Sequence, residues 1–233
     1  MKFFFLISLR LCENKNKHSN TGFEKKIFFG YNVSTENLFP KKGNKKVKIS
    51  QLSDEELIHN LQKIINKNSS EFEILYEELF QRYSSQVYSL CRYYGLQHDD
   101  SCDVLQETFI KLVNFIKSFR ENSLFKPWFF KIVLNLVRNK YNDLKKHNFI
   151  SIEEISSTTP FNEENFDIFH NREVIIGILN RIPREFKEVI LLRIYGEMKI
   201  DEIASVLNIS ARQVYNRLNK GYELVKKFLE KEE

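Results

Sequence analysis

The stretch IDEIASVLNISARQVYNRLNKGYELVKKFL, residues 200–229, contains two helical patterns separated by a short turn. Its first part keeps apolar residues on one helical face as far as Leu207. The tripeptide Asn208-Ile209-Ser210 follows, and Ser210 is a preferred N-cap residue for a final helix over 211–229. A helix, a three-residue turn and a long second helix form the helix-turn-helix arrangement.

The final helix separates an apolar face from a polar face. At 100° per residue, one narrow sector holds the apolar core positions, Val214, Leu218, Gly221, Val225 and Phe228. The opposite face holds Arg212, Tyr215, Asn216, Asn219 and Lys220. In the major groove of DNA, Arg and Lys can donate to guanine, and Asn can pair bidentately with adenine. The pattern therefore predicts a DNA-reading helix, with a solvated face on a helical hairpin as the alternative.

Further helices and a linker precede this unit. Helical patterns run over 173–181 and 186–194, and they end at Pro183 and Gly196 respectively. The stretch 148–172 is acidic and rich in Ser and Thr, and we interpret it as a flexible linker between two domains.

The segment KPWFFKIVLNLVRNKY, residues 126–141, combines a core-like helix with a basic and amide-rich stripe. The stripe consists of Lys131, Asn135, Arg138, Asn142 and Lys145, and the opposite side is apolar. Aromatic rings beside cations suit a nucleic acid whose bases are partly unstacked, because a base can stack on a ring while Lys and Arg hold phosphates. The alternative is a buried aromatic core with cations that solvate the far face. Phe129 is assigned to the core.

The segment DVLQETFIKL, residues 103–112, places Asp103, Gln106 and Glu107 near one another on a helix, at positions i, i+3 and i+4. Such a face can dock a basic partner helix. A catalytic carboxylate pair is the alternative, but no His or Cys accompanies it at helical spacing, and the sequence contains no Gly-rich phosphate loop, G-x-S-x-G or H-E-x-x-H motif.

The composition predicts an all-α fold. Seven Gly and four Pro in 233 residues favour long helices over a turn-rich β fold, and no stretch shows strand alternation. Three Cys without C-x-x-C spacing argue against a disulfide framework and against a zinc site, which suits a reducing cytoplasm. The net charge of +5 is unevenly spread: residues 110–147 carry nine Lys and Arg against two acids. One partner is therefore expected to be a polyanion.

The first 50 residues stand apart from the rest. The apolar run from Phe3 to Leu9 is far shorter than the roughly 20 residues that span a bilayer. Arg10 and Leu11 do not fit the small-residue site at which a signal peptide is cleaved. We expect a disordered basic extension or an upstream start codon that is not used, with a signal or membrane anchor as the alternative.

Three motifs in this order resemble the sigma-70 family of bacterial RNA polymerase sigma factors, and in particular the extracytoplasmic-function (ECF) group. DVLQETFIKL is similar to the polymerase-binding helix, and FRENSLFKPWFFKIVLNLVRNKY to the segment that reads and melts the −10 element. The segment from Ile182 to Leu229 is similar to the C-terminal domain that reads the −35 element. The resemblance covers about residues 53–231.

The resemblance implies roles for individual residues. Polymerase binding falls to Asp103, Gln106 and Glu107. The −10 DNA contacts, including a loop that captures a flipped base, fall to Phe119, Arg120, Asn122, Ser123, Trp128, Lys131, Asn135, Arg138 and Asn139. The −35 contacts fall to Arg212, Tyr215, Asn216, Arg217, Asn219 and Lys220. Asn139 stands where many members carry Asp, and Tyr215 and Asn219 stand where Arg is common, so the promoter sequence stays open.

The expected organisation is a basic extension at 1–50, a region 2-like domain at 53–147, the linker at 148–172, and a region 4-like domain at 173–233. The expected protein is a cytoplasmic sigma factor, not an enzyme, that binds core RNA polymerase and promoter DNA and is held by an anti-sigma partner. No cofactor, metal or small-molecule substrate is expected. The alternatives are a stand-alone helix-turn-helix regulator that does not bind polymerase, an enzyme with a DNA-binding tail, and a membrane-associated regulator anchored by residues 1–12.

Overall fold

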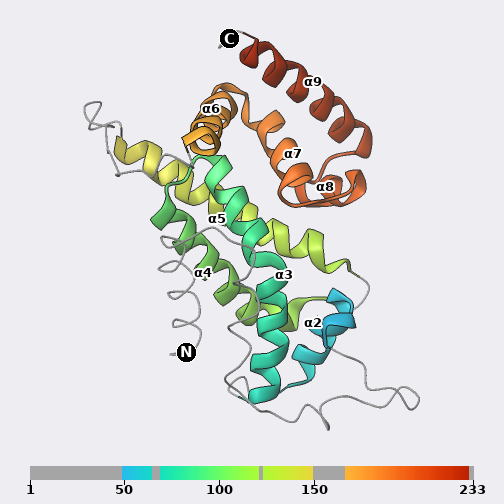
Figure 1. Cartoon of the computed structure of the whole chain (residues 1–233). Coiled ribbons are helices and arrows are strands. Elements are labelled where there is room, and N and C mark those ends of the chain that lie inside the picture. Colours follow the sequence, from blue (N-terminus) through green and yellow to red (C-terminus); the bar gives the residue numbers. More distant parts are fainter. Residues whose placement is uncertain (1–48, 65–68, 121–122, 149–165, 231–233) are drawn as a thin grey trace. The chain divides into compact units, whose positions relative to one another are not determined.

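A computed structural model describes residues 49–64, 69–120, 123–148 and 166–230 of the 233-residue chain. All regular elements in these ranges are helical, which confirms the predicted all-α class. They are a 3-10 turn η4 (Ile49–Gln51), α2 (Asp54–Lys63), α3 (Ser70–Tyr94), α4 (His98–Phe115), a 3-10 turn η5 (Ile116–Ser118), α5 (Phe125–Asn148), α6 (Phe166–Arg181), α7 (Arg184–Ile194), α8 (Ile200–Leu207) and α9 (Ala211–Leu229) (Figure 1).

Local signals explain where these helices begin and end. A capping box begins α2: the Ser53 N–H donates to Glu56 Oε2 at 2.9 Å, and the Glu56 N–H donates to Ser53 Oγ at 3.1 Å. A second capping box joins Ser210 and Gln213 at the start of α9. Gly95, with φ of 110°, ends α3, since other residues rarely adopt that conformation.

The start of α6 differs from the expectation. The helix begins at Phe166, inside the stretch interpreted as a linker, rather than at residue 173. Acidic composition alone does not exclude a helix, because carboxylates near an N-terminus favour one. Residues 149–165, the rest of that stretch, and residues 1–48 lie outside the described part of the chain.

The chain divides into two compact units, and α3, α4 and α5 contribute residues to both. The described part of the first unit comprises residues 49–83 and 112–125. Its buried side chains include Leu57, Ile58, Leu61, Phe72, Leu75, Leu79, Leu112, Ile116 and Phe125, each at most 2% exposed. Apolar burial of this kind is the main stabilising term of the unit.

The second unit holds the described residues of 84–111 and 126–230. Within it, α9 packs against α6, α7 and α8, as the orange to red helices of Figure 1 show. Gly221 allows α9 to approach α7 closely, because a Cβ there would lie 2.8 Å from Cδ1 of Ile190. The helix-turn-helix turn passes through Asn208, whose φ of 55° is left-handed, a conformation that Asn tolerates better than most residues.

The cysteines differ from one another. Cys91 is a fully buried free thiol, and burial raises its pKa, so it is not a reactive nucleophile. Cys102 is disulfide-bonded, which departs from the expectation drawn from cysteine number and spacing.

Candidate nucleic-acid and polymerase interfaces

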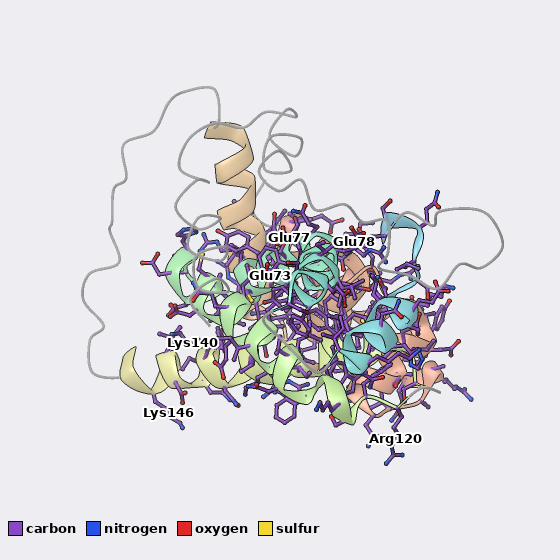
Figure 2. The ribbon with its side chains drawn as sticks, turned by 90° about the horizontal axis from the view of Figure 1, so that it is seen from below. Glu73, Glu77, Glu78, Arg120, Lys140 and Lys146 are labelled. Carbon is purple, nitrogen blue, oxygen red and sulfur yellow. The ribbon has the colours of Figure 1, made fainter. Side chains whose placement is uncertain are left out.

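The polar stripe of α5 faces solvent. Lys131, Asn135 and Asn139 are exposed, while Trp128 is half-buried. The opposite face is fully buried through Phe129, Phe130, Val133, Leu134 and Val137, which confirms Phe129 as a core residue. Lys140 and Lys146 extend the cationic character of the helix towards its C-terminal end (Figure 2). This face can offer cations and amides to a nucleic acid while its aromatic rings hold the helix in place.

Arg138 belongs to the predicted DNA-binding stripe, but its guanidinium is engaged by a carboxylate within the second unit. Its Nε donates to Glu188 Oε1 at 2.7 Å, and Nη2 donates to Glu188 Oε2 at 2.5 Å. Arg184 Nε and the Tyr94 hydroxyl also donate to Glu188 Oε1, at 2.7 and 3.0 Å. Burial alone would raise the pKa of Glu188, but the hydrogen bonds from Arg138 and Arg184 outweigh it and lower that pKa. Arg138 is thus a packed, paired residue in this conformation.

The residues that precede α5 are placed differently from one another. Arg120 is exposed and its side chain projects outward in Figure 2, while Ser123 is half-buried. Phe119 is only 6% exposed, and its ring packs edge-on against Phe125 with centroids 6.2 Å apart. Asn122, also predicted to contact DNA, lies outside the described residues. The described part of this segment therefore has the exposed charge of Arg120 next to the buried ring of Phe119.

The acidic face of α4 is accessible. The side chains of Asp103 and Glu107 are 67% and 54% exposed, and Gln106 is half-buried. Leu105 and Phe109 of the same helix are buried, at 4% and 2% exposed. The structure therefore brings the three predicted polymerase-binding side chains to one helix surface.

Lys140 of α5 joins this acidic face. Its ammonium lies 2.9 Å from Asp100 Oδ1 and 3.3 Å from Asp103 Oδ2. The hydrogen bond to Asp100, helped by the one to Asp103, raises the pKa of Lys140. The Oδ2 atom of Asp103 is therefore directed towards the Lys140 ammonium.

The predicted DNA-reading face of α9 is exposed along its length. Arg212, Tyr215, Asn216, Asn219 and Lys220 all face solvent, with Tyr215 56% exposed. Val214 and Leu218 lie beneath them, at 0% and 6% exposed. The exposed side chains of this surface are polar, which suits a helix that enters a DNA groove.

Arg217 differs from its neighbours on α9. It is half-buried, and its Nη2 lies 2.9 Å from Glu185 Oε2 on α7. It lies beside the core of this unit and links the last helix to α7.

Sequence reasoning missed a buried polar cluster in the second unit. Lys187 is 4% exposed, and its ammonium donates to the Tyr94 carbonyl at 2.6 Å and to Asn180 Oδ1 at 2.7 Å. The same ammonium lies 4.7 Å from the Tyr94 ring centroid. Burial, reinforced by Lys145, lowers the pKa of Lys187 to about 7. The only sequence signal was the Arg184 and Glu188 pair at i, i+4, which resembles an ordinary surface pair.

Metal-binding groups and membrane-spanning helices are both absent from the described ranges. No group of three or more His, Cys, Asp or Glu side chains there is arranged to hold a metal ion. None of the helices in those ranges has the length and apolar character needed to span a bilayer.

Family comparisons agree with this geometry. The family model for Sigma-70 region 2 matches residues 79–147, and the model for Sigma-70, region 4 matches residues 172–225. The chain belongs to the sigma-70 family. It is an RNA polymerase sigma factor of the ECF type, so core RNA polymerase and promoter DNA are its partners.

Among its relatives is the ECF RNA polymerase sigma-E factor of Escherichia coli (strain K12), 27% identical over 191 residues, which cover 75% of this chain and 93% of the relative. Two solved structures share the fold. One is CnrH in complex with the cytosolic domain of CnrY, with a TM-score of 0.60 and 20% identity, covering 77% of this chain and 99% of that one. The other is the sigma factor RpoE with the anti-sigma factor NepR from Bartonella quintana, with a TM-score of 0.52 and 17% identity, covering 66% and 96%.

Proposed function

We propose that this sigma factor divides its work among three helix surfaces, carried by a domain at 53–147 and a second domain at 173–233. The exposed acids of α4 bind core RNA polymerase, the polar stripe of α5 with the preceding segment holds the opened −10 strand, and α9 reads the −35 duplex. The observation that carries the proposal is that most side chains of each predicted polar face are solvent-exposed, while the opposite face is buried.

Asp103, Gln106 and Glu107 form the proposed polymerase contact. Asp103 and Glu107 are exposed and Gln106 is half-buried, on a helix whose opposite side is anchored by Leu105 and Phe109. Exposed carboxylates steer association with a basic partner and fix its register more than they add raw affinity. Charge reversal on this face is therefore expected to weaken complex formation without unfolding the helix.

The −10 strand is proposed to lie along α5, over Lys131, Asn135 and Asn139, with Arg120, Asn122 and Ser123 at the segment before the helix. Trp128 offers a half-buried ring for stacking. Phe119 and Arg138 contribute from less exposed positions. Unstacking a base costs a few kcal/mol, which stacking and phosphate contacts offset. The protein thus acts by binding, and it catalyses no reaction.

The −35 contact is proposed to use Arg212, Tyr215, Asn216, Asn219 and Lys220, with Arg217 at its edge. These side chains match the donor and acceptor pattern of the major groove, where one good bidentate pair discriminates by about 1–3 kcal/mol. Tyr215, 56% exposed, offers a ring and a hydroxyl where a cation would favour guanine. A −35 preference distinct from that of Arg-bearing relatives is expected.

We further propose that an anti-sigma protein holds this chain inactive and that the chain acts in the cytoplasm. Support comes from the fold shared with RpoE, which was solved with the anti-sigma factor NepR. The test is to purify the protein from its native cells in gentle conditions and identify what co-purifies. We expect the sigma factor to co-purify with a partner protein that core polymerase displaces. Recovery of the sigma factor only as a free chain, or only with polymerase, would contradict the proposed anti-sigma partner.

The whole function is tested by transcription in vitro with purified protein and sigma-free core polymerase on genomic fragments. Specific start sites that require this protein are expected. Specific DNA binding without polymerase-dependent initiation would instead favour a stand-alone regulator.

A further inference from the structure

We propose that α2 is a positioning helix for −10 recognition, which holds both ends of the segment between η5 and α5 through Gln62 and Glu55. This inference rests on the proposed function, because it assigns these two residues to the strand-capturing segment. The helix spans Asp54–Lys63 and therefore ends well before residue 79, where the match to the region 2 family model begins. All the contacts involved lie within the first unit.

Gln62 holds the beginning of the segment. Its Nε2 donates to two backbone carbonyls, Ile116 O and Phe119 O, each at 2.8 Å. The Phe119 N–H closes the same turn by donating to Ile116 O at 3.2 Å. One amide thus donates to two carbonyls at the end of η5, and one of them, Ile116 O, also accepts the Phe119 N–H. An apolar side chain at position 62 would remove both of these part-buried hydrogen bonds and leave the Phe119 carbonyl without the Gln62 donor.

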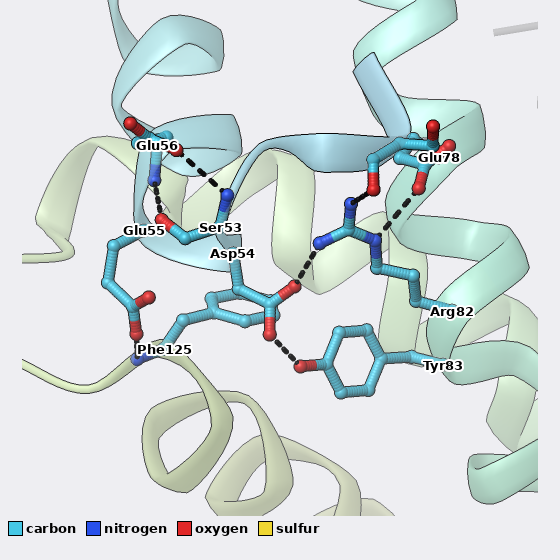
Figure 3. Close-up of polar contacts among 9 residues, drawn as sticks. Ser53, Asp54, Glu55, Glu56, Glu78, Arg82, Tyr83 and Phe125 are labelled. Carbon is cyan, nitrogen blue, oxygen red and sulfur yellow. Dashed lines mark hydrogen bonds and ion pairs between the residues drawn. The ribbon is translucent and has the colours of Figure 1, made fainter. Parts of the chain in front are cut away.

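Glu55 holds the end of the segment. Its Oε1 accepts the N–H of Phe125, the first residue of α5, at 3.0 Å (Figure 3). That N–H is one of the four donors that a helix start cannot satisfy internally, and a carboxylate there also complements the positive end of the helix dipole. The cap comes from a residue 70 positions earlier rather than from the residue before the helix.

The spacing on α2 suits this double contact. Glu55 and Gln62 are seven residues apart, which is two helical turns and about 10 Å along one face. Between them Leu57, Ile58 and Leu61 are at most 2% exposed, so the helix is fixed in rotation by its apolar side. A rigid helix with two polar contacts at this distance limits where the ends of the segment can lie.

The helix α2 is itself held against α3. Asp54 accepts hydrogen bonds from Arg82 Nη1 at 2.8 Å and from the Tyr83 hydroxyl, and Arg82 Nε donates to Glu78 at 2.9 Å (Figure 3). The Tyr83 ring also packs edge-on against Phe125, with centroids 5.5 Å apart. Arg82 and Tyr83 lie within the matched region 2, so the contacts pass from the family domain through α2 to the segment.

Arg120 and Ser123 are two of the three described side chains between Phe119 and Phe125, the third being Leu124. The Ser123 N–H donates to the Arg120 carbonyl at 2.9 Å, and α2 holds the backbone at Phe119 and at Phe125 on either side of this bond. Ordering a backbone residue costs about 1–2 kcal/mol, and anchors that are already in place reduce what DNA binding must supply. We therefore assign to α2 a part in base preference rather than in overall affinity for polymerase.

The test compares Gln62→Met with Lys63→Met. Met preserves chain length and helix propensity, and Lys63 is an exposed neighbour on the same helix, so the pair isolates the two hydrogen bonds. Holoenzyme of each variant is presented with fork-junction DNA whose −10 single strand is randomised, and the selected sequences are counted. Gln62→Met is expected to reduce the enrichment of preferred over disfavoured bases by on the order of tenfold, while core-polymerase affinity stays within about twofold. Lys63→Met is expected to select as the wild type does.

A second pair of variants keeps the test decisive if Gln62→Met folds poorly. Glu55→Ala removes the acceptor for Phe125, whereas Glu55→Gln keeps an oxygen in the same place and is expected to restore base preference to near the wild-type level. Wild-type preference in both Gln62→Met and Glu55→Ala overturns the positioning role. Equal loss of core binding and base preference also overturns it, since α2 would then be purely structural. A wild-type holoenzyme that selects no sequence at all contradicts the proposed function itself.

Discussion

Arg217 of α9 forms an ion pair with Glu185 of α7, with Nη2 and Oε2 2.9 Å apart. The pair is partly exposed, so it contributes at most about 1 kcal/mol to stability. Its more important effect is on DNA binding, because a guanidinium that already has a carboxylate partner gains less from a phosphate. Lys220 lies exposed on the same helix, where its ammonium is accessible to a phosphate.

We therefore expect Arg217→Gln to weaken binding to −35 duplex DNA less than Lys220→Gln does. Lys220→Gln is expected to cost several-fold in affinity and to lower the dependence of log affinity on log salt by about one charge. The measurement is a salt titration of holoenzyme on duplex fragments. A larger loss for Arg217→Gln would make Arg217 a principal DNA contact.

The acidic face of α4 yields a prediction for polymerase binding. Asp103→Lys combined with Glu107→Lys is expected to weaken binding to core polymerase by at least tenfold and to leave helix content unchanged. Glu71→Lys combined with Glu230→Lys is the matched control, because both residues are exposed and the change in net charge is the same. Equal binding by the two double variants would place the interface elsewhere.

Two cations of the basic stripe of α5, Lys131 and Arg138, lie in different environments. Substituting each of them therefore distinguishes an effect on DNA binding from an effect on stability. Lys131 is exposed, whereas Arg138 makes a bidentate pair with the buried Glu188. Arg138→Met is expected to lower the free energy of unfolding by about 1–3 kcal/mol, because it removes two charge-assisted hydrogen bonds. Lys131→Met is expected to leave it unchanged within about 0.5 kcal/mol. Denaturant unfolding checks both, and equal values would mean that the pair contributes nothing in solution.

Lys187 yields a prediction about pH. Its pKa is lowered to about 7 by burial, whereas an unfolded Lys has a pKa of about 10.4. Between these values the unfolded chain binds the proton and the folded chain does not, so this group makes stability rise with pH by about 1.4 kcal/mol per unit. Below pH 7 both states are protonated and the slope vanishes.

The free energy of unfolding is measured as a function of pH for the wild type and for Lys187→Met. The difference between the two at each pH isolates the contribution of Lys187. The other groups that face Lys187 are Glu188, Tyr94, Tyr141 and Lys145, and they are retained in the variant. The difference in free energy of unfolding should change in favour of the wild type from pH 7 towards pH 10. A flat difference would show that the Lys187 ammonium remains hydrated.

Periodicity and capping predicted much of the fold. The bounds of α9 follow from the Ser210 cap and from the apolar sector that contains Leu218, because these signals are local. The exposed faces of α4, α5 and α9 also follow from helical spacing. The roles of individual residues on those faces stay predictions, since they depend on partners.

Contacts between distant segments could not be predicted. Gln62 has no special pattern, and only folding brings it to Ile116 and Phe119. Glu188 reads as a surface acid at i, i+4 from Arg184, but it is 4% exposed and holds Arg138. Helical spacing reports which face is apolar, and it contains no information about which polar residue finds a buried partner.

The central claim is tested most directly by mixing the purified protein with sigma-free core RNA polymerase and following co-elution by size-exclusion chromatography over a range of salt. The account predicts a stable complex that the Asp103→Lys, Glu107→Lys double variant fails to form. Elution of the wild-type chain alone at every salt concentration, with no inhibitor bound to it, would contradict the account.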